Sequence, residues 1–448
     1  MNVFAISVLS TALAFGLAAA GTSSSEAMAL FQQPLSRKEA LEIAARHNSA
    51  LNKARADVAA ASGQSRQLRS TGMPRLRSDA SFRANDRGSI ESFGFVDSPA
   101  QNWSANAQIV QPLYEGGRIT ANRAQGRMVT EQAGANLGST SANTALEVLT
   151  AYDDALLAAE QITVQEASIG LLGKELEDQK RRLEAGTAPR FNVLRAEVAV
   201  ANAQPKLIRA RNAYRIAKNN LINLLGYDLP AAMWNEIPLK FADKLTAEPL
   251  SLTVEDALTY ARTMRPELKS LTLAADIQRE VVKAAKSGAK PAVNGFIGYG
   301  ARNSAFTRDL SEEKSGWFAG AQLTWDLWDG DLTKGKVAEA RAILERAEET
   351  IRETDRSISL EVRTAWSNLE ESREVLESQK KVLEQAEEAL RLAKARTEAG
   401  SGTQLEVLDA QTALTESRTT QIQALRDYSV ARTRLDRSTG TLMLPGVP

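Results

Sequence analysis

Two acidic residues, Glu406 and Asp409, are the side chains of this 448-residue sequence whose type and spacing most suggest chemistry. They stand three positions apart after a glycine-containing turn, and residues three apart lie on the same face of a helix. Two carboxylates on one face could attract cations. Taken alone, however, such a pair is typical of a solvent-exposed helix surface.

The remaining side chains argue against an enzyme. The sequence has no Cys, which excludes disulfides, thiolate metal sites and a cysteine nucleophile. His47 is the only histidine, so a surface or packing role is favoured over metal binding. No phosphate-binding glycine loop, G-x-S-x-G motif or metal-spaced His/carboxylate cluster is present in the sequence. We therefore expect no catalytic residue, no metal and no cofactor.

Composition indicates an elongated helical protein. Charged residues make up 25% of the chain and aromatic residues only 5%, which suits helices packed along their length better than a large round core. Lys and Arg together number 55, as do Asp and Glu, so nothing indicates binding to nucleic acid or a polybasic membrane patch.

The N-terminus is predicted to be a signal peptide, residues 1–29. An apolar run over residues 3–20 is followed by small residues ending in Ala-Met-Ala, which favours cleavage near Ala29 or Ala20. No Lys or Arg precedes the run, for which a misplaced start codon would account. The alternative is an uncleaved anchor helix, since roughly 18 apolar residues just span a bilayer.

A helix–turn–helix tip occurs twice in the chain. Residues 182–197 (RLEAGTAPRFNVLRAE) and 396–411 (RTEAGSGTQLEVLDAQ) are offset by 214 positions and identical at seven of sixteen. Gly186 and Gly400 are predicted to end one helix and start the turn. Their repetition indicates a duplicated structural unit.

The duplication organises the whole chain. The first repeat, residues 30–225, is predicted to contain a helix from Leu35 to about Ser70, a β-hairpin (74–114), a helix of roughly 100 Å, a tip (186–190) and a closing helix. An irregular segment, residues 226–251, follows. The second repeat, residues 252–440, has the same order, with a hairpin at 291–328 and a tip at 400–404. Residues 441–448 form a tail.

The predicted strands alternate between one apolar and one polar face. The first places Arg75, Arg77 and Arg83 on its polar side, and the last is expected around residues 317–327. Their length of roughly 10–12 residues and their two-residue pattern are those of membrane-spanning β-strands. Four strands cannot close around a water-filled lumen. Unpaired edges are forbidden in lipid, so several copies must combine their strands; three copies would give twelve.

The sequence resembles the TolC-like family of bacterial outer-membrane efflux ducts over nearly all of its predicted mature length. The resemblance lies in the order and spacing of the tandem repeats, the R-x-E-A-G tips, the closing run 434–440, and hairpin exits that end in an aromatic residue, an acid and Gly. It implies a mainly α fold with β: antiparallel coiled-coil helices forming an α-barrel, and a homotrimer with a twelve-stranded β-barrel. It also implies an outer-membrane location with a periplasmic tunnel that docks an adaptor protein and an inner-membrane transporter of RND or ABC type.

The resemblance also implies roles for the tip residues. Glu406 and Asp409 match acidic positions that narrow the periplasmic entrance, and threefold symmetry would make rings of three carboxylates that repel one another and attract cations. Gly186 and Gly400, with Arg182 and Arg396, would lie where an adaptor binds. Two other gate positions of the family are occupied here by Thr397 and Gly402, which puts the family's closed-state side-chain bonds in doubt.

We therefore expect a passive exit duct for an efflux pump or a type I secretion system. Its barrel-lining charges would be Arg75, Arg77 and Arg83, which would favour anions, although solvated strand charges explain them equally well. The alternative is a periplasmic coiled-coil scaffold or adaptor-like protein. Such a scaffold has no use for four strands of membrane length.

Overall fold

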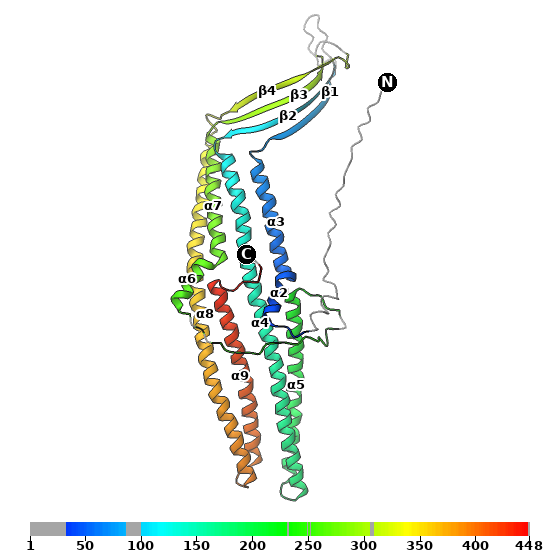
Figure 1. The fold of residues 1–448 in the computed structure, drawn as a ribbon, viewed down its shortest axis with the longest axis vertical. Helices are drawn as coiled ribbons and strands as arrows, with labels where there is room; N and C mark the ends of the chain where they lie inside the picture. The colour runs from blue at the N-terminus through cyan, green and yellow to red at the C-terminus, as the bar shows by residue number, and fades with distance from the viewer. Residues whose placement is uncertain are drawn as a thin grey trace.

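The computed structural model describes residues 33–86, 100–230, 233–248, 250, 252–304 and 309–446. The expected signal peptide, residues 1–29, lies outside these ranges. The described chain is elongated, with a curved sheet at one end and two helical tips at the other (Figure 1). In chain order its elements are α2 (Arg37–His47), α3 (Ser49–Ser70), β1 (Arg75–Ala84), β2 (Gln101–Glu115), α4 (Arg118–Glu184), α5 (Arg190–Leu225), α6 (Val254–Met264), α7 (Pro266–Lys286), the short 3₁₀ helix η3 (Ser287–Ala289), β3 (Ala292–Asn303), β4 (Glu313–Thr324), α8 (Leu332–Glu398) and α9 (Gln404–Thr439).

The two halves of the chain repeat these elements at nearly equal lengths. Helices α4 and α8 each have 67 residues, and α5 and α9 each have 36. In Figure 1 the two long helices run from the sheet to the tips, with α3 and α7 beside their upper halves and α5 and α9 beside their lower halves. Two helices of different lengths thus share one long partner in each repeat.

The single helix expected from Leu35 to about Ser70 is wrong, because it is broken at Asn48. The Asn48 side chain accepts hydrogen bonds from the backbone N–H groups of Ala50 and Leu51 and so starts a second helix. The equivalent helix of the second repeat breaks at Arg265, whose backbone is extended because Pro266 follows it. Each repeat therefore has an 11-residue helix before its longer upper helix.

These breaks lie near the middle of the molecule's length (Figure 1). The main hydrophobic core, which includes Leu35, Leu51 and Tyr152, is also found there, and we call this region the waist. Tyr152 of α4 is fully buried there; its hydroxyl donates to the backbone carbonyl of Leu35 (2.7 Å) and contacts the Asp243 carboxylate (3.1 Å). Burial and this carboxylate raise the pKa of the Tyr152 phenol. The segment around Phe241 pairs with Leu35 through a short parallel bridge. The waist thus fastens the irregular segment between the repeats to the start of the first repeat.

The four strands form one antiparallel sheet in the order β1-β2-β3-β4. Strand β2 of the first repeat pairs with β3 of the second, so the sheet itself joins the two repeats. Strand β4 ends at Thr324, so the expectation that the last strand continues to Leu327 is wrong by three residues. Strands β1 and β4 have no further neighbour among the described residues, which leaves an open edge on each side of the sheet.

The register confirms the predicted division of the sheet into two faces. Arg77 is paired with Gln108 and Arg83 with Asn102, so polar side chains stand together on one side. Leu76, Ile109 and Ile297 are aligned on the other side. On the polar side, the rings of Phe296 and Phe318 lie against glycines of the neighbouring strand, where a Cβ atom would collide with them.

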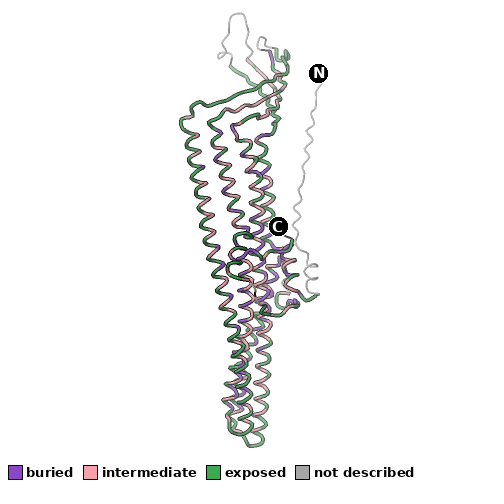
Figure 2. Tube along the Cα trace, turned by 60° about the vertical axis from the view of Figure 1, so that its left-hand side comes forward, coloured by how far each residue is buried: buried purple, intermediate pink, exposed green. Residues whose placement is uncertain are grey.

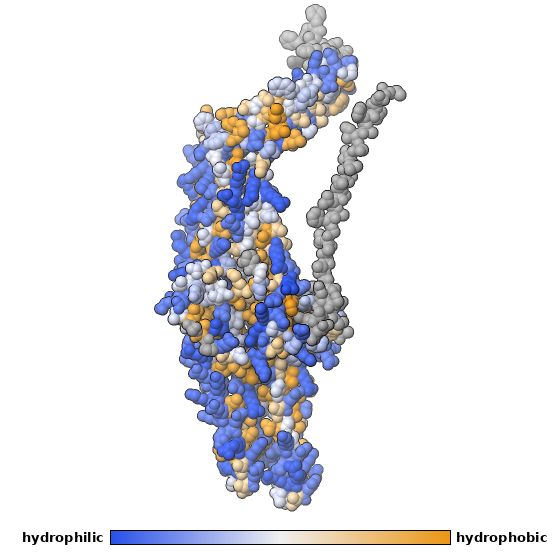
Figure 3. Space-filling model, in the orientation of Figure 1, coloured by the Kyte–Doolittle hydropathy of each residue, from blue (hydrophilic) through white to orange (hydrophobic). Residues whose placement is uncertain are grey.

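Burial is concentrated in the helical part of the molecule. Figure 2 shows exposed residues over most of the sheet and at the tips, and buried residues mainly at the waist and along the helix pairs. The space-filling view shows apolar side chains gathered on the sheet and in patches along the helices (Figure 3). Within the described ranges, no helix combines the length and hydropathy needed to cross a membrane.

Candidate functional site

The two tips have the same backbone geometry. Gly186 and Gly400 both have φ +73°, a left-handed conformation that favours glycine. In each tip the backbone carbonyl of an arginine, Arg182 or Arg396, accepts the two hydrogen bonds that close the turn. Both glycines therefore act as the predicted helix-ending residues.

Outside the backbone, the two tip arginines differ. The Arg182 side chain binds Asp178 of its own helix at 2.7 Å. The Arg396 guanidinium instead reaches across the turn to the Glu406 carboxylate, at 3.8 Å. The structure therefore brings two of the predicted site residues, Arg396 and Glu406, together in the second tip.

The predicted acid pair lies in the first two turns of α9. Glu406 is close to the N-cap residue Thr403, whose hydroxyl accepts from the Glu406 backbone N–H (3.3 Å). A carboxylate in this position is stabilised by the positive end of the helix dipole. Asp409 is exposed, and no hydrogen bond or ion pair to it is found within the described part of the chain. The two carboxylates thus differ: Glu406 is partly engaged and Asp409 faces solvent.

One side chain joins the two tips, and sequence reasoning missed it. The Gln404 side-chain amide donates to the backbone carbonyl of Asn192 at 2.9 Å, linking the first turn of α9 to the first turn of α5. Gln404 is buried, and its side-chain oxygen has no partner among the described residues. The partners are 212 positions apart, so no local sequence signal marks the contact.

The three predicted strand arginines, Arg75, Arg77 and Arg83, lie far from the tips, at the opposite end of the molecule (Figure 1). All three are exposed on the polar face of β1, the strand at one open edge of the sheet. The structure therefore separates the predicted site residues into two groups, one at each end of the elongated molecule.

A charged cluster at the waist was also missed by sequence reasoning. Arg265, with a side chain 2% exposed, makes two hydrogen bonds to the Glu361 carboxylate (2.7 and 3.0 Å). Arg437 of α9 binds the same carboxylate (3.1 Å) and also Glu267 of α7 (2.8 Å). These four side chains fasten α7, α8 and α9 together where the upper and lower helices meet.

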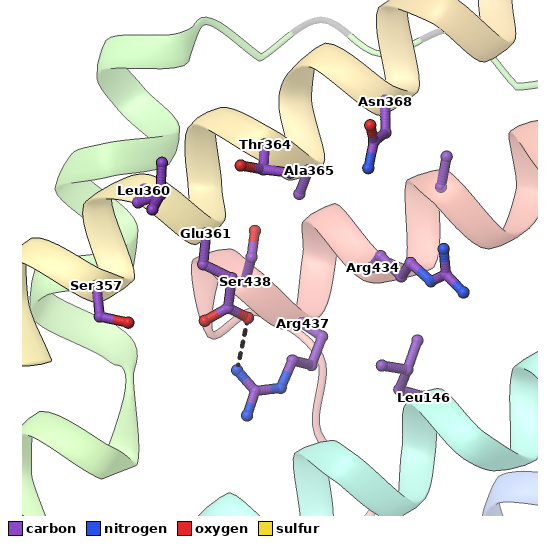
Figure 4. Close-up of a pocket in the computed structure, with 11 residues that line it drawn as sticks. Leu146, Ser357, Leu360, Glu361, Thr364, Ala365, Asn368, Arg434, Arg437 and Ser438 are labelled. Carbon is purple, nitrogen blue, oxygen red and sulfur yellow. Dashed lines mark hydrogen bonds and ion pairs between the residues drawn. The ribbon is translucent and has the colours of Figure 1, made fainter.

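Beside this cluster is a groove of about 540 Å³ between α8 and α9. In Figure 4 the Glu361 and Arg437 side chains of its lining meet in an ion pair, and Arg434 lies further along α9. The remaining lining is mixed, including Leu360 and Thr364 of α8. No group of three or more potential metal-binding side chains occurs in the described residues.

The lower helices expose apolar residues along two faces. Repeat-equivalent positions differ sharply in burial: Leu408 of α9 is 8% exposed and packs in the chain, whereas its equivalent in α5, Leu194, is 49% exposed. Val430 and Ile216 differ in the same way, at 2% and 51%. Exposed apolar residues follow α5 at Phe191, Leu194, Val198, Ile208 and Ile216, and α8 at Leu360, Val375, Val382 and Leu392.

Comparison with known proteins gives a consistent result. A family model described as "Outer membrane efflux protein" matches residues 40–227 and 257–441, one match in each repeat. The chain is 23% identical to outer membrane protein TolC of Vibrio cholerae, over 76% of this chain and 77% of that protein. It is 24% identical to the alkaline protease secretion protein AprF of Pseudomonas aeruginosa, over 66% of this chain and 61% of AprF.

Two further similarities cover nearly the whole chain. Cobalt-zinc-cadmium resistance protein CzcC of Cupriavidus metallidurans is 23% identical over 91% of this chain and 90% of its own. Among solved structures, that of the outer-membrane channel OprN superposes with a TM-score of 0.77 at 19% identity, over 92% of this chain and 91% of OprN.

Proposed function

The chain belongs to the outer membrane efflux protein family, and from this premise we propose that three copies form a passive duct through the outer membrane and into the periplasm. The duct would be the exit of a tripartite efflux pump or a type I secretion system. Solutes or unfolded protein would pass along the water-filled interior of this duct. In this proposal the chain itself has no catalytic residues and uses no cofactor.

The observation that carries the proposal is that the sheet has two open edges, at β1 and β4. These strands are the repeat equivalents of β3 and β2, which pair with each other inside the chain. Inside the chain, β2 pairs with β3, the second strand of one repeat with the first strand of the next. The same step taken once more pairs β4 with β1 of a second copy. Three copies would then close twelve strands without a free edge, which is the condition for a β-structure in lipid.

The helices support the same closure. Inside the chain α9 packs against α4, with Arg426 bound to Asp154 at 2.7 Å. One repeat further on, α5 of a second copy would pack against α8. Their exposed apolar stripes, defined above by Phe191–Ile216 of α5 and Leu360–Leu392 of α8, would then be buried against each other, which favours association.

The polar face of the sheet would line the barrel in this arrangement, because the apolar face must meet lipid. Arg75, Arg77 and Arg83 would then stand along the barrel lumen and favour anions there. At the opposite end Glu406 and Asp409 would form rings of carboxylates at the periplasmic entrance, where they would favour cations. The barrel lumen and the periplasmic entrance would thus carry opposite charges.

Partners would dock at the tips. We propose that a periplasmic adaptor binds around Gly186 and Gly400, with Arg182 and Arg396 beside them, and that an RND or ABC transporter in the inner membrane supplies the energy. AprF is named for protease secretion and CzcC for cobalt-zinc-cadmium resistance. The cargo would therefore be set by the docked transporter, since the passive duct only provides the path.

Fractionation with a pair of matched variants tests this proposal. The protein should sediment with outer membranes and run as a detergent-stable trimer. Ile208→Glu, in the apolar stripe of α5, should abolish the trimer, because a buried unpaired charge is costly. Asn202→Glu should leave it intact, because Asn202 lines a groove formed with α4 and α9 of its own chain; its repeat equivalent is already an acid, Glu416. A monomeric wild-type protein in the periplasm would refute the proposal.

A further inference from the structure

The link between the two tips inside the chain is the starting observation. Gln404, the first residue of α9, donates its side-chain amide to the backbone carbonyl of Asn192, the third residue of α5 (2.9 Å). It is a hydrogen bond that ties the second repeat to the first at this end of the molecule. Its geometry can be carried to the next repeat because both tips have the same backbone.

The equivalence of the two tips is close. Helices α5 and α9 begin at positions 190 and 404, which are 214 apart, as are Gly186 and Gly400. The backbone N–H groups of residues 186–188 and of residues 400–402 bond to equivalent carbonyls. Arg190 therefore occupies the place of Gln404, and Glu406 occupies the place of Asn192.

The side chains at these equivalent places have opposite charges. Where Gln404 meets Asn192 inside one chain, Arg190 of a second copy would meet Glu406. Arg190 is exposed in the single chain although Gln404 is buried, as expected for a residue whose neighbour is a separate molecule. An arginine in this position reaches further than a glutamine and can bind both the backbone carbonyl and the carboxylate of residue 406.

We infer that in the closed duct Arg190 of each copy binds Glu406 of the adjacent copy, so that three such ion pairs alternate with three Gln404–Asn192 bonds around the tips. The inference rests on the proposed trimer and identifies a partner for one of its gate residues. Arg396, at 3.8 Å with both side chains well exposed, is the partner of Glu406 in the single chain. That contact is long enough to leave the carboxylate able to accept hydrogen bonds from a second guanidinium.

The inference gives the two predicted gate acids different roles. Glu406 would hold neighbouring copies together, and its charge would be neutralised by Arg190. Asp409, exposed and one turn further along α9, would remain as the free carboxylate of the entrance. Glu406→Gln should therefore open the duct more often with little change in ion selectivity. Asp409→Asn should reduce cation preference with little change in opening.

Cysteine cross-linking tests the contact directly, because the natural sequence contains no cysteine. The double variant Arg190→Cys/Glu406→Cys is treated with a short bismaleimide in outer membranes and run on a denaturing gel. We expect covalent dimers and trimers. The matched pair Asn192→Cys/Gln404→Cys should instead cross-link within one chain and run as a monomer of altered mobility.

The controls separate the inference from the proposed function. Native gels establish first that both double variants are trimeric; a wild-type protein that is not trimeric overturns the duct itself. If the trimer is present but Arg190→Cys/Glu406→Cys yields only monomers, the ion pair is refuted and the duct is not. Covalent dimers from Arg190→Cys alone would also refute it, because they would place two Arg190 residues together.

A charge exchange gives an independent test in planar bilayers. Arg190→Glu should increase the fraction of time that the duct is open, because it places two acids in contact between copies. Adding Glu406→Arg should restore the wild-type open fraction by reversing the pair. If the double exchange is as open as the single variant, the two side chains do not bind each other.

Discussion

Replacing Gly226 by alanine is expected to destabilise the protein by about 3 kcal/mol or more, the largest effect of a single methyl group that the structure predicts. Gly226 ends α5 with φ +83°, which costs an alanine about 1–2 kcal/mol. A Cβ atom there would also lie 2.7 Å from the carbonyl carbon of His47 and closer still to its oxygen. This is backbone at the break between α2 and α3, so it cannot move aside by changing a rotamer.

Gly186→Ala is the matched control. It has a similar backbone conformation, φ +73°, but a Cβ atom would meet nothing within 4 Å. Its expected cost is the conformational term alone, about 1–2 kcal/mol. The midpoint of thermal unfolding of the detergent-solubilised protein should fall much further for Gly226→Ala. Equal losses would show that the waist does not hold this helix break as tightly as the structure indicates.

Arg265→Met is expected to have the second largest effect, a loss of about 2–3 kcal/mol. The variant keeps most of the side-chain volume but leaves the Glu361 and Glu267 carboxylates short of a cation. Because Glu361 is partly exposed, water relieves some of this cost, and the loss should stay below the range for a fully buried pair. The upper and lower helices of the second repeat should separate at lower temperature.

Arg262→Met provides the comparison for this variant. Arg262 lies on α6, three residues before Arg265, and also binds an acid of α8, Asp355 at 3.2 Å, but both side chains are well exposed. Exposed ion pairs contribute up to about 1 kcal/mol. Unfolding measured at low and high salt should therefore show a large, salt-insensitive loss for Arg265→Met and a small one for Arg262→Met. A larger loss for Arg262→Met would contradict the assignment of the waist cluster.

The parts of the fold that could be predicted from sequence are those written in periodic patterns. Two helices of 67 residues repeat their apolar spacing many times, and the tips carry the same residues twice. The alternation in β1 likewise predicted which side of the sheet carries Arg75, Arg77 and Arg83. Such signals accumulate along the chain and outweigh local exceptions.

What could not be predicted depends on single residues or distant partners. The break at Asn48 is one residue within a helical pattern, and its cap becomes visible only in three dimensions. Pro266 could have marked the equivalent break at Arg265, because a residue before proline avoids the helical conformation, but the prediction of one unbroken helix missed it. The bond from Gln404 to Asn192 and the pair of Arg265 with Glu361 join residues 212 and 96 positions apart, so no spacing rule reveals them.

The same limit applies to the candidate gate. The sequence placed Glu406 and Asp409 on one helix face and treated them as a pair. The structure distinguishes them, since Glu406 has Arg396 and Thr403 beside it and Asp409 is left in solvent. The difference arises from the turn between α8 and α9. This turn brings the Arg396 side chain, in the last turn of α8, close to Glu406 in the first turn of α9.

The central claim, a water-filled path through an assembly of this chain, is tested most directly by conductance of the purified trimer in planar bilayers. We expect discrete current steps of uniform size that scale with salt, with longer openings in the Glu406→Gln variant. Under a salt gradient, the reversal potential should indicate a preference for cations. It should shift toward zero in the Asp409→Asn variant. The account would be contradicted if the wild type, Glu406→Gln and Asp409→Asn were all shown to be trimeric and none of them conducted current.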